Sequence, residues 1–493
     1  MKYFLTLIQL WVGFLSICAS YPKANIWIIP SVESPQVYRN YAQTSKVHLE
    51  MARGEVEHIQ LVFPSKVNEE YRFTFDRYLK GIQISARELK KMNGYYDALV
   101  PFKNQLKCTD TLTAVWITVQ CPSRVPVGKY HQTIKIEGSK HFTIQLDYNV
   151  HHTTIPLKSS IPITVGVENR CMTECLNDKE ADKERQRWVD FVLSYRMTPV
   201  FGTQITPERW QYEHSFSPWA WNDKRSIRLL NDRRYSCYML PFFTLSENEL
   251  ASLLCNIQKK GKLKESLFYI WDEPAYMEDY EQIKRKVNII RKYASDARIL
   301  TTFFCGPRNG PRKGDLYAVF DYLKHHIHVA TISLAPCKGN EEEVQHIRYK
   351  VPEGIDWWSY VCWQPGGNEP NFLLQMKGIQ QRAIMWRTWK NGSQGFLYWN
   401  CNIYHKRNPF TYITDMPHGD GILIYPGDIL GCKGPIASAR LERWRDGAEE
   451  MELLRLVEKN YSKEKADTLL NIVYSSPLSF IEKAHNIPFF RKE

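Results

Sequence analysis

The chain has 493 residues, of which 43% are hydrophobic and 24% are charged, and this ordinary balance excludes a largely disordered protein. At about 150 residues per domain the length suits three domains, or two if one of them is an α/β barrel of ~250 residues. The formal net charge is +12. The basic runs are not interleaved with stacking aromatic residues, so we expect a basic surface and no nucleic-acid partner.

The first twenty residues have the pattern of a secretory signal peptide. Lys2 supplies a positive charge, residues 4–17 are almost wholly apolar, and small residues at 18–20 suit cleavage before Tyr21. No later run of ~18 apolar residues follows, so no integral membrane segment is expected after cleavage. The sequence therefore predicts a protein that is secreted or held in the lumen of the secretory pathway, including a lysosome-like compartment.

The cysteines and glycosylation motifs bear on the same compartment. The chain has twelve cysteines, and Cys18 leaves with the signal. Two disulfide pairings are considered, and they are Cys108 with Cys121 and Cys171 with Cys175. Glycosylation sequons begin at Asn391 and Asn460 and predict a glycoprotein. The cysteine spacing does not match a zinc finger and no phosphate-binding glycine loop occurs, so we expect neither a metal nor a cofactor.

Residues 21–158 are predicted to form an N-terminal β-sandwich domain. Segments 115–120, 130–137 and 142–150 are rich in Thr, Val, Ile and Tyr, and turn signals separate them. Several short strands at this spacing are typical of a sandwich.

Residues 159–460 change to apolar strands that alternate with amphipathic helices, which indicates βα units. Eight candidate strands lie at 163–167, 200–202, 237–240, 267–271, 299–304, 329–333, 356–361 and 395–400. Eight successive units predict an α/β fold with a closed (β/α)8 TIM barrel, and a doubly wound open sheet is the alternative. Residues 461–493 are expected to form a C-terminal helical extension.

Two adjacent carboxylates, Asp272 and Glu273, follow the fourth predicted strand, at the end where barrels carry catalytic groups. Pro274 is expected to hold Glu273 extended. Neighbouring strand residues point to opposite faces, so both carboxylates can face a pocket only if the strand is already turning into its loop. Burial and a charged neighbour raise the pKa of one carboxyl, which suits a general acid. A capped helix is the alternative for the dipeptide alone, but the flanking strand and proline favour a site.

Residues 271–274, Trp-Asp-Glu-Pro, resemble the active-site motif of glycoside hydrolase family 123, the retaining β-N-acetylgalactosaminidases, and of a related uncharacterised domain family. The resemblance continues in chain order and covers most of residues 50–460. Its further segments are 52–62, 357–360, 395–400, 419–427 and 440–447.

The resemblance implies two domains and a retaining, substrate-assisted mechanism. Glu273 would be the general acid and base, and Asp272 would orient the 2-acetamido group of the sugar and stabilise an oxazolinium-like intermediate. From their places at strand ends, we predict that Tyr360 donates a hydrogen bond to the acetamido oxygen and that Trp399 forms the floor under the sugar ring. The further substrate-binding candidates are Trp358, Tyr398 and Asp420, and for each aromatic residue the alternative is packing inside the barrel.

The predicted function is therefore a secreted glycosidase that removes β-linked N-acetylgalactosamine from a glycan or glycoconjugate containing N-acetylhexosamine. One alternative is an ordinary retaining glycosidase, in which a carboxylate such as Glu369 is the nucleophile about 5–5.5 Å from the acid. The other is a glycan-binding barrel protein without turnover. If hydrolysis requires the 2-acetamido group of the substrate, the first alternative is excluded. If the protein binds glycans without hydrolysing them, the second alternative is correct.

Overall fold

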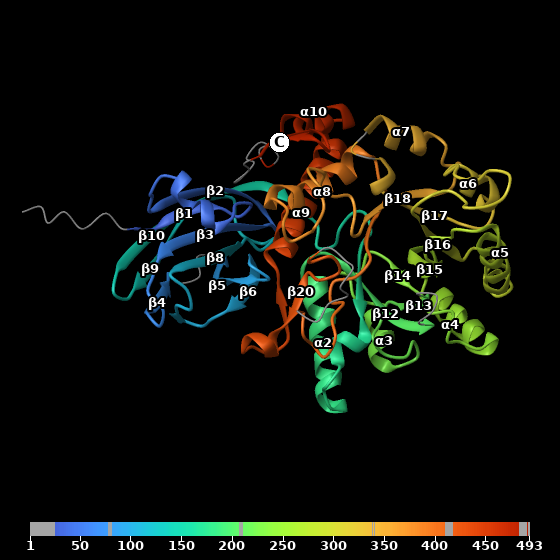
Figure 1. The fold of residues 1–493 in the computed structure, drawn as a ribbon, viewed down its shortest axis with the longest axis horizontal. Coiled ribbons are helices and arrows are strands. Elements are labelled where there is room, and N and C mark those ends of the chain that lie inside the picture. Colours follow the sequence, from blue (N-terminus) through green and yellow to red (C-terminus); the bar gives the residue numbers. More distant parts are fainter. Residues whose placement is uncertain are drawn as a thin grey trace, which may run out of the picture.

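The computed structural model describes residues 25–76, 81–206, 211–337, 339, 341–409, 418–482 and 491. The predicted signal peptide lies outside these residues. A sheet-rich N-terminal part, a set of long helices and a second, larger sheet follow one another across the molecule (Figure 1). None of the helices in the described ranges is both long and apolar enough to span a bilayer.

The N-terminal part consists of two five-stranded sheets, with strand orders β1-β3-β8-β5-β6 and β2-β10-β9-β4-β7. The strands are β1 (Trp27–Pro30), β2 (Lys46–Arg53), β3 (Val56–Pro64), β4 (Glu70–Phe75), β5 (Gln83–Met92), β6 (Tyr95–Pro101), β7 (Gln105–Lys107), β8 (Leu112–Gln120), β9 (Gly128–Glu137) and β10 (His141–Thr154), and the short helix η1 (Pro35–Asn40) follows β1. Together they form the sheet-rich region that the sequence predicted.

One hydrophobic core lies between the two sheets, because alternate residues along each strand point to it. In β9, Ile134 and Ile136 are buried and the residues that follow each of them are exposed or partly exposed. Strand β3 differs, since every residue from Val56 to Phe63 is buried. Its Leu61 joins the core between the sheets, and its Val62 joins a larger core that continues into the second part of the chain. The outer face of this sheet is therefore covered by the rest of the protein.

The second part is built on a nine-stranded sheet of order β13-β12-β11-β19-β18-β17-β16-β15-β14. Its strands are β11 (Ile163–Glu168), β12 (Thr198–Thr206), β13 (Gln211–Ser215), β14 (Tyr238–Met239), β15 (Ser266–Trp271), β16 (Arg298–Phe303), β17 (Val329–Ser333), β18 (Asp356–Val361) and β19 (Phe396–Tyr398). A strand lies at each of the eight predicted positions. Seven parallel pairings join these strands in the consecutive order of a barrel, and the second and third strands, β12 and β14, are not paired with each other.

Helices connect and cover these strands (Figure 1). They are α1 (Asn169–Thr173), α2 (Asp178–Ser194), α3 (Lys224–Leu229), α4 (Glu247–Lys259), α5 (Met277–Arg291), α6 (Ala318–Leu323), α7 (Glu341–Tyr349), α8 (Gly378–Lys390), α9 (Ala439–Asn460) and α10 (Lys463–Val473), with two hairpins, β20 (Ile424–Pro426) with β21 (Pro435–Ala437) and β22 (Tyr474–Ser476) with β23 (Ser479–Phe480). Helix α4 shows why such segments fold. Ser246 and Glu249 form a capping box at its start, and Leu250, Leu253 and Leu254 share its buried face.

The predicted closed (β/α)8 barrel is corrected to a nearly closed sheet of nine strands. β13 runs antiparallel to β12 and lies between the second and third parallel strands. Strand β14 has only two residues, which is too short to form a series of hydrogen bonds with β13. Strand β12 has nine residues, and β13 pairs with the C-terminal part of β12, which extends beyond the residues that pair with β11. The backbone N–H of Phe216, directly after β13, donates to the carbonyl of Met239 in β14 at 2.6 Å. The gap between the two edges is therefore narrow.

Neither considered disulfide forms, because Cys108, Cys121, Cys171 and Cys175 all carry free thiols. The first two cysteines flank β8, and nine residues at about 3.4 Å each separate them by roughly 30 Å. In the second pair, Cys171 is buried and Cys175 is exposed. Proximity in sequence therefore did not bring either pair within bonding distance.

The two glycosylation sequons differ in access. Asn391 is fully buried at the end of α8, so it is closed to modification once the chain has folded. Asn460 is exposed at the end of α9. Glycosylation at Asn460 stays a prediction.

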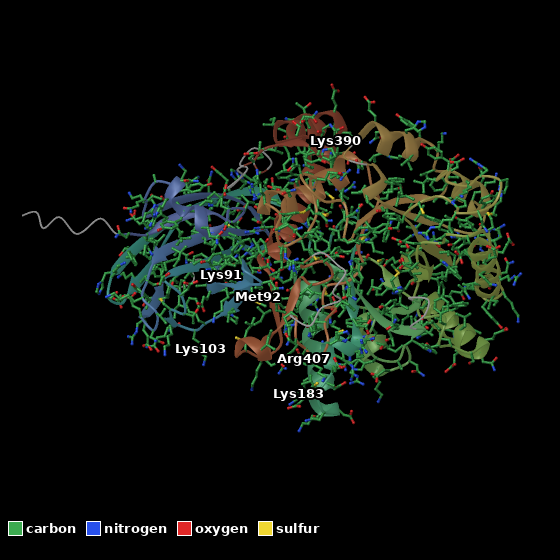
Figure 2. All side chains as sticks on the ribbon, in the orientation of Figure 1. Lys91, Met92, Lys103, Lys183, Lys390 and Arg407 are labelled. Atoms are coloured by element: carbon green, nitrogen blue, oxygen red, sulfur yellow. The ribbon has the colours of Figure 1, made fainter. Side chains whose placement is uncertain are left out.

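Helix α9 joins the two parts of the molecule through buried charges. Arg440 donates two hydrogen bonds to Asp97 in β6, at 2.9 and 3.1 Å, and both side chains are 1% exposed. One turn further on, Arg443 donates to the carbonyl of Ser31 at 2.8 Å. A smaller apolar cluster, to which Met92 belongs, lies at the same junction, and Figure 2 labels Met92 at the edge of the N-terminal part. The sheet-rich part is thus fixed to the larger part by polar and apolar contacts.

Replacement of Arg440 by alanine leaves Asp97 buried without its cation, so we expect a loss of about 3–5 kcal/mol in the free energy of unfolding. Urea unfolding followed by tryptophan fluorescence measures it. Lys463→Ala is the control, because Lys463 pairs with Asp467 on the exposed surface, where such a pair contributes about 0.5 kcal/mol or less. Equal effects of the two variants would contradict the role given to Arg440.

Candidate active site

The carboxylate pair stands where β15 turns into its loop. The register of β15 with β16 is irregular between Tyr269 and Trp271, and Glu273 has a φ of 45°. A non-glycine residue in this left-handed region costs about 1–3 kcal/mol. The backbone N–H of Glu273 donates to the hydroxyl of Thr302 at 3.0 Å, which helps to hold this turn. The chain thus leaves strand geometry at the pair, so the two side chains do not follow the alternation of a strand.

The expectation that Pro274 holds Glu273 extended is wrong. A proline disfavours the right-handed helical conformation of the residue before it, but it leaves a turn open to that residue. The observed positive φ and the hydrogen bond to Thr302 select the turn.

Two hydroxyl groups hold the Asp272 carboxylate. Tyr269 and Thr302 each donate to its Oδ1 atom at 2.7 Å, and their own oxygens lie 3.1 Å apart. Thr302 thus donates to Asp272 and accepts from the backbone of Glu273, which uses both functions of one hydroxyl group. The arrangement fixes the direction of the Asp272 side chain and leaves its other oxygen, Oδ2, free of these two donors.

Glu273 differs from its neighbour in its environment. Its carboxyl group opens to solvent at the mouth of the sheet but has protein atoms on most sides, and this desolvation raises its pKa to about 7. The charge of Asp272 raises the pKa further, whereas Arg308 and a hydrogen bond from Tyr360 to Oε1 oppose the rise. Near neutral pH the group is therefore divided between its acid and base forms.

A pocket opens beside Asp272, at the carboxyl ends of β11, β12, β15 and β19. Its apolar lining includes Val200, Leu397 and the half-buried indole of Trp399, and its polar groups include Asp272 and Asn400. Apolar walls with a few polar groups at one side are typical of sugar and other small-molecule sites.

Of the aromatic candidates, Trp399 and Tyr398 line this pocket. Asp420 supports both from behind, because its Oδ1 accepts hydrogen bonds from the Tyr398 hydroxyl and the Trp399 indole, each at 3.0 Å. Burial raises the pKa of Asp420 to about 6. One carboxylate oxygen of Asp420 thus orients both the Tyr398 ring and the Trp399 indole.

Two other sequence candidates lie away from the pocket. Trp358 is 1% exposed and fills the interior of the sheet, where a Cβ atom on Gly395 would come within 2.2 Å of its indole. Glu369, the alternative nucleophile, accepts a hydrogen bond from Arg387 of α8 at 2.9 Å. Neither residue is among those that line the pocket.

Among the pocket residues that sequence reasoning missed, three carry rings. Tyr212 and His214 come from β13, the antiparallel strand that no eight-strand pattern includes, and Tyr269 lies within the predicted fourth strand. His214 stacks on Tyr269 with ring centroids 4.2 Å apart and planes 6° apart, and burial lowers the pKa of this histidine to about 3. A neutral imidazole therefore backs the tyrosine that holds Asp272. Strand alternation pointed Tyr269 inward, but no signal marked β13.

No cluster of three or more potential metal ligands (His, Cys, Asp or Glu) occurs within the described ranges.

Comparison with known proteins gives a family and a fold. The family model described as glycoside hydrolase 123, catalytic domain, matches residues 183–457. A solved family 123 glycoside hydrolase from Clostridium perfringens, studied for glycolipid glycan hydrolysis, has a TM-score of 0.63 and 14% sequence identity, over 91% of this chain and 92% of that one. No curated protein sequence matches the chain.

Two further solved glycoside hydrolases are similar at lower scores. A GH2 β-galacturonidase from Eisenbergiella tayi has a TM-score of 0.35 and 9% identity, over 80% of this chain and 89% of that one. A GH5 xyloglucanase from Bacteroides ovatus has a TM-score of 0.28 and 10% identity, over 82% of this chain and 98% of that one.

Substitution of Tyr360 by phenylalanine should raise the pKa of Glu273 above 7, because the lost hydrogen bond favours the ionised form. The group then stays protonated to a higher pH. NMR titration of ¹³C-labelled glutamate side chains measures the shift, and Glu273→Gln identifies the resonance. Tyr349→Phe is the control on an exposed tyrosine. A pKa that is unchanged or lower in Tyr360→Phe would disprove the assigned contact.

Proposed function

Because the chain belongs to glycoside hydrolase family 123 and is a glycosidase, we propose that it removes β-linked N-acetylgalactosamine by a retaining, substrate-assisted mechanism. Its substrate is a glycan or glycoconjugate that ends in this sugar. The observation that carries the proposal is the adjacent pair Asp272 and Glu273, one held by two hydroxyl groups and the other with a pKa of about 7.

In the first step, protonated Glu273 gives its proton to the glycosidic oxygen while the bond from that oxygen to C1 of the sugar breaks. The carbonyl oxygen of the sugar's own 2-acetamido group attacks C1 from the other face and closes an oxazolinium ring. Asp272 accepts a hydrogen bond from the acetamido N–H and stabilises the positive charge that develops there. The hydroxyls of Tyr269 and Thr302 keep Asp272 aimed at that group.

In the second step, Glu273, now ionised, takes a proton from a water molecule that attacks C1. The ring opens, the acetamido group is restored, and the sugar leaves with its original configuration. A pKa near 7 suits both steps, because one group must donate a proton and then accept one at the same pH. Trp399 offers its indole to the apolar face of the sugar.

The composition of the pocket favours substrate assistance over a protein nucleophile. A protein nucleophile requires a second carboxylate about 5–5.5 Å from the acid, on the far side of the sugar ring. Among the described residues that line the pocket, Asp272 is the carboxylate, and Glu369 is engaged with Arg387. Asp272 adjoins the acid in the chain, which suits an orienting role.

We place this activity in the secretory lumen or outside the cell, as the N-terminal pattern suggests. Six of the ten free cysteines in the described ranges are buried, and a chain of this size buries a large core without disulfides.

Chromogenic β-N-acetylgalactosaminide and β-N-acetylglucosaminide test the activity together. We expect the wild type to prefer the galactosaminide, and Glu273→Gln and Asp272→Asn each to lower kcat by about 100- to 10,000-fold, the range for loss of an acid–base or charge-stabilising group. Glu464→Gln and Asp178→Asn, at exposed positions, are the matched controls. Activity that survives in both site variants would rule out the assigned residues.

A thiazoline that mimics the bicyclic oxazoline tests the mechanism. It should inhibit the wild type competitively and bind at least tenfold more weakly to Asp272→Asn, because the carboxylate contacts the ring nitrogen. A galactoside without the acetamido group serves as the control substrate, and we expect no measurable turnover. Hydrolysis of that galactoside at a comparable rate would favour a protein nucleophile instead.

A further inference from the structure

The loops after β15 and β16 form one rim beside Glu273. The backbone N–H of Arg308 donates to the carbonyl of Ala275 at 2.7 Å, and the N–H of Met277 donates to the side chain of Asn309 at 2.8 Å. These bonds fix Arg308 against the segment that follows the catalytic pair. These hydrogen bonds hold the two loops together at the carboxyl ends of β15 and β16.

Arg308 has no carboxylate within 4 Å among the described residues. Its guanidinium lies 6.0 Å from the centre of the Tyr276 ring and contacts Cys305. By contrast, Arg312 on the same loop pairs with Asp315 and Asp321. The charge of Arg312 is therefore neutralised by its neighbours. The guanidinium of Arg308 remains available to a substrate group.

Arg308 lies on the side of the site where the leaving group of the substrate is expected. Asp272 lines the pocket proposed for the N-acetyl sugar, and Glu273 is not among the lining residues. A general acid stands at the glycosidic oxygen, so the group that leaves with this oxygen lies beyond Glu273. Arg308 is close enough to lower the pKa of Glu273 by its charge. It therefore stands beside the first sugar of the leaving group.

We propose that Arg308 and Tyr276 form a leaving-group subsite for a sugar that carries a carboxylate, so that the enzyme prefers N-acetylgalactosamine linked to a hexuronic acid. This inference rests on the proposed function and extends it to the second sugar of the substrate. Nothing in the catalytic pair itself requires an acidic substrate.

The chemistry of both side chains fits such a sugar. A guanidinium presents paired N–H donors that match the two oxygens of a carboxylate. The Tyr276 ring is 46% exposed, and one face of an exposed aromatic ring accepts the C–H face of a pyranose. Glu278 on the same rim accepts a hydrogen bond from the side chain of Asn309 at 3.2 Å.

Two synthetic disaccharides test the proposal, with β-N-acetylgalactosamine linked to C4 of glucuronic acid or to C4 of glucose. For the wild type we expect kcat/KM to be about tenfold higher on the acidic disaccharide. Arg308→Gln should bring this ratio to about one. Lys313→Gln removes a charge from an exposed position of the same loop and should keep the ratio. The ratio cancels any effect of either variant on Glu273 itself.

Each outcome separates the two proposals. Turnover of both disaccharides at a ratio of one, or an equal fall of the ratio in both variants, overturns the subsite and leaves the proposed function. If neither disaccharide is cleaved, calorimetry with Glu273→Gln and the same two compounds decides. If Glu273→Gln binds the acidic disaccharide more tightly than the neutral one, and the double variant Glu273→Gln/Arg308→Gln does not, the subsite is supported even without activity. Equal binding of the two disaccharides, or no binding, overturns the subsite.

Discussion

Arg440 connects three parts of the molecule through one buried guanidinium. It pairs with Asp97 of the sheet-rich part, and it also donates to the carbonyls of Phe372 and Gly419, at 2.7 and 2.6 Å. A buried arginine is stable only when nearly all its donors are satisfied. Strand β6, the segment before α8 and the loop after β19 therefore have to meet at one point. Loss of Asp97 would leave the buried guanidinium without its counter-charge, and loss of either carbonyl would leave a buried N–H donor unsatisfied.

This constraint reaches the active site through the loop after β19. Gly419 precedes Asp420, whose carboxylate accepts from the indole of Trp399 and the hydroxyl of Tyr398. The orientation of the indole in the pocket thus depends on a hydrogen-bond chain that begins in α9. The opposite wall is set separately, by Tyr269 and Thr302 of β15 and β16. Two independent supports hold the two sides of one pocket, which is how a site on loops becomes rigid enough for catalysis.

The adjacent carboxylates acquire different properties from their surroundings alone. Asp272 accepts two hydroxyl donors, whereas Glu273 loses solvent and faces the charge of its neighbour. Environment, and not residue type, therefore separates the group that stabilises charge from the group that transfers a proton. The left-handed backbone of Glu273 makes this possible, because an extended strand would have turned one of the two side chains away.

The sequence by itself determined the eight parallel strands, their order and the place of Asp272 and Glu273, because apolar periodicity and local motifs depend on neighbours along the chain. Tertiary structure alone decided the antiparallel strand with Tyr212 and His214, the burial of Trp358, and the separation of the cysteines. It also decided the conformation of Glu273, where a hydrogen bond from a distant strand outweighed the expectation from Pro274. These features depend on which strands are long enough to pair with an additional strand and on which side chains meet across the sheet. The local sequence pattern contains neither kind of information.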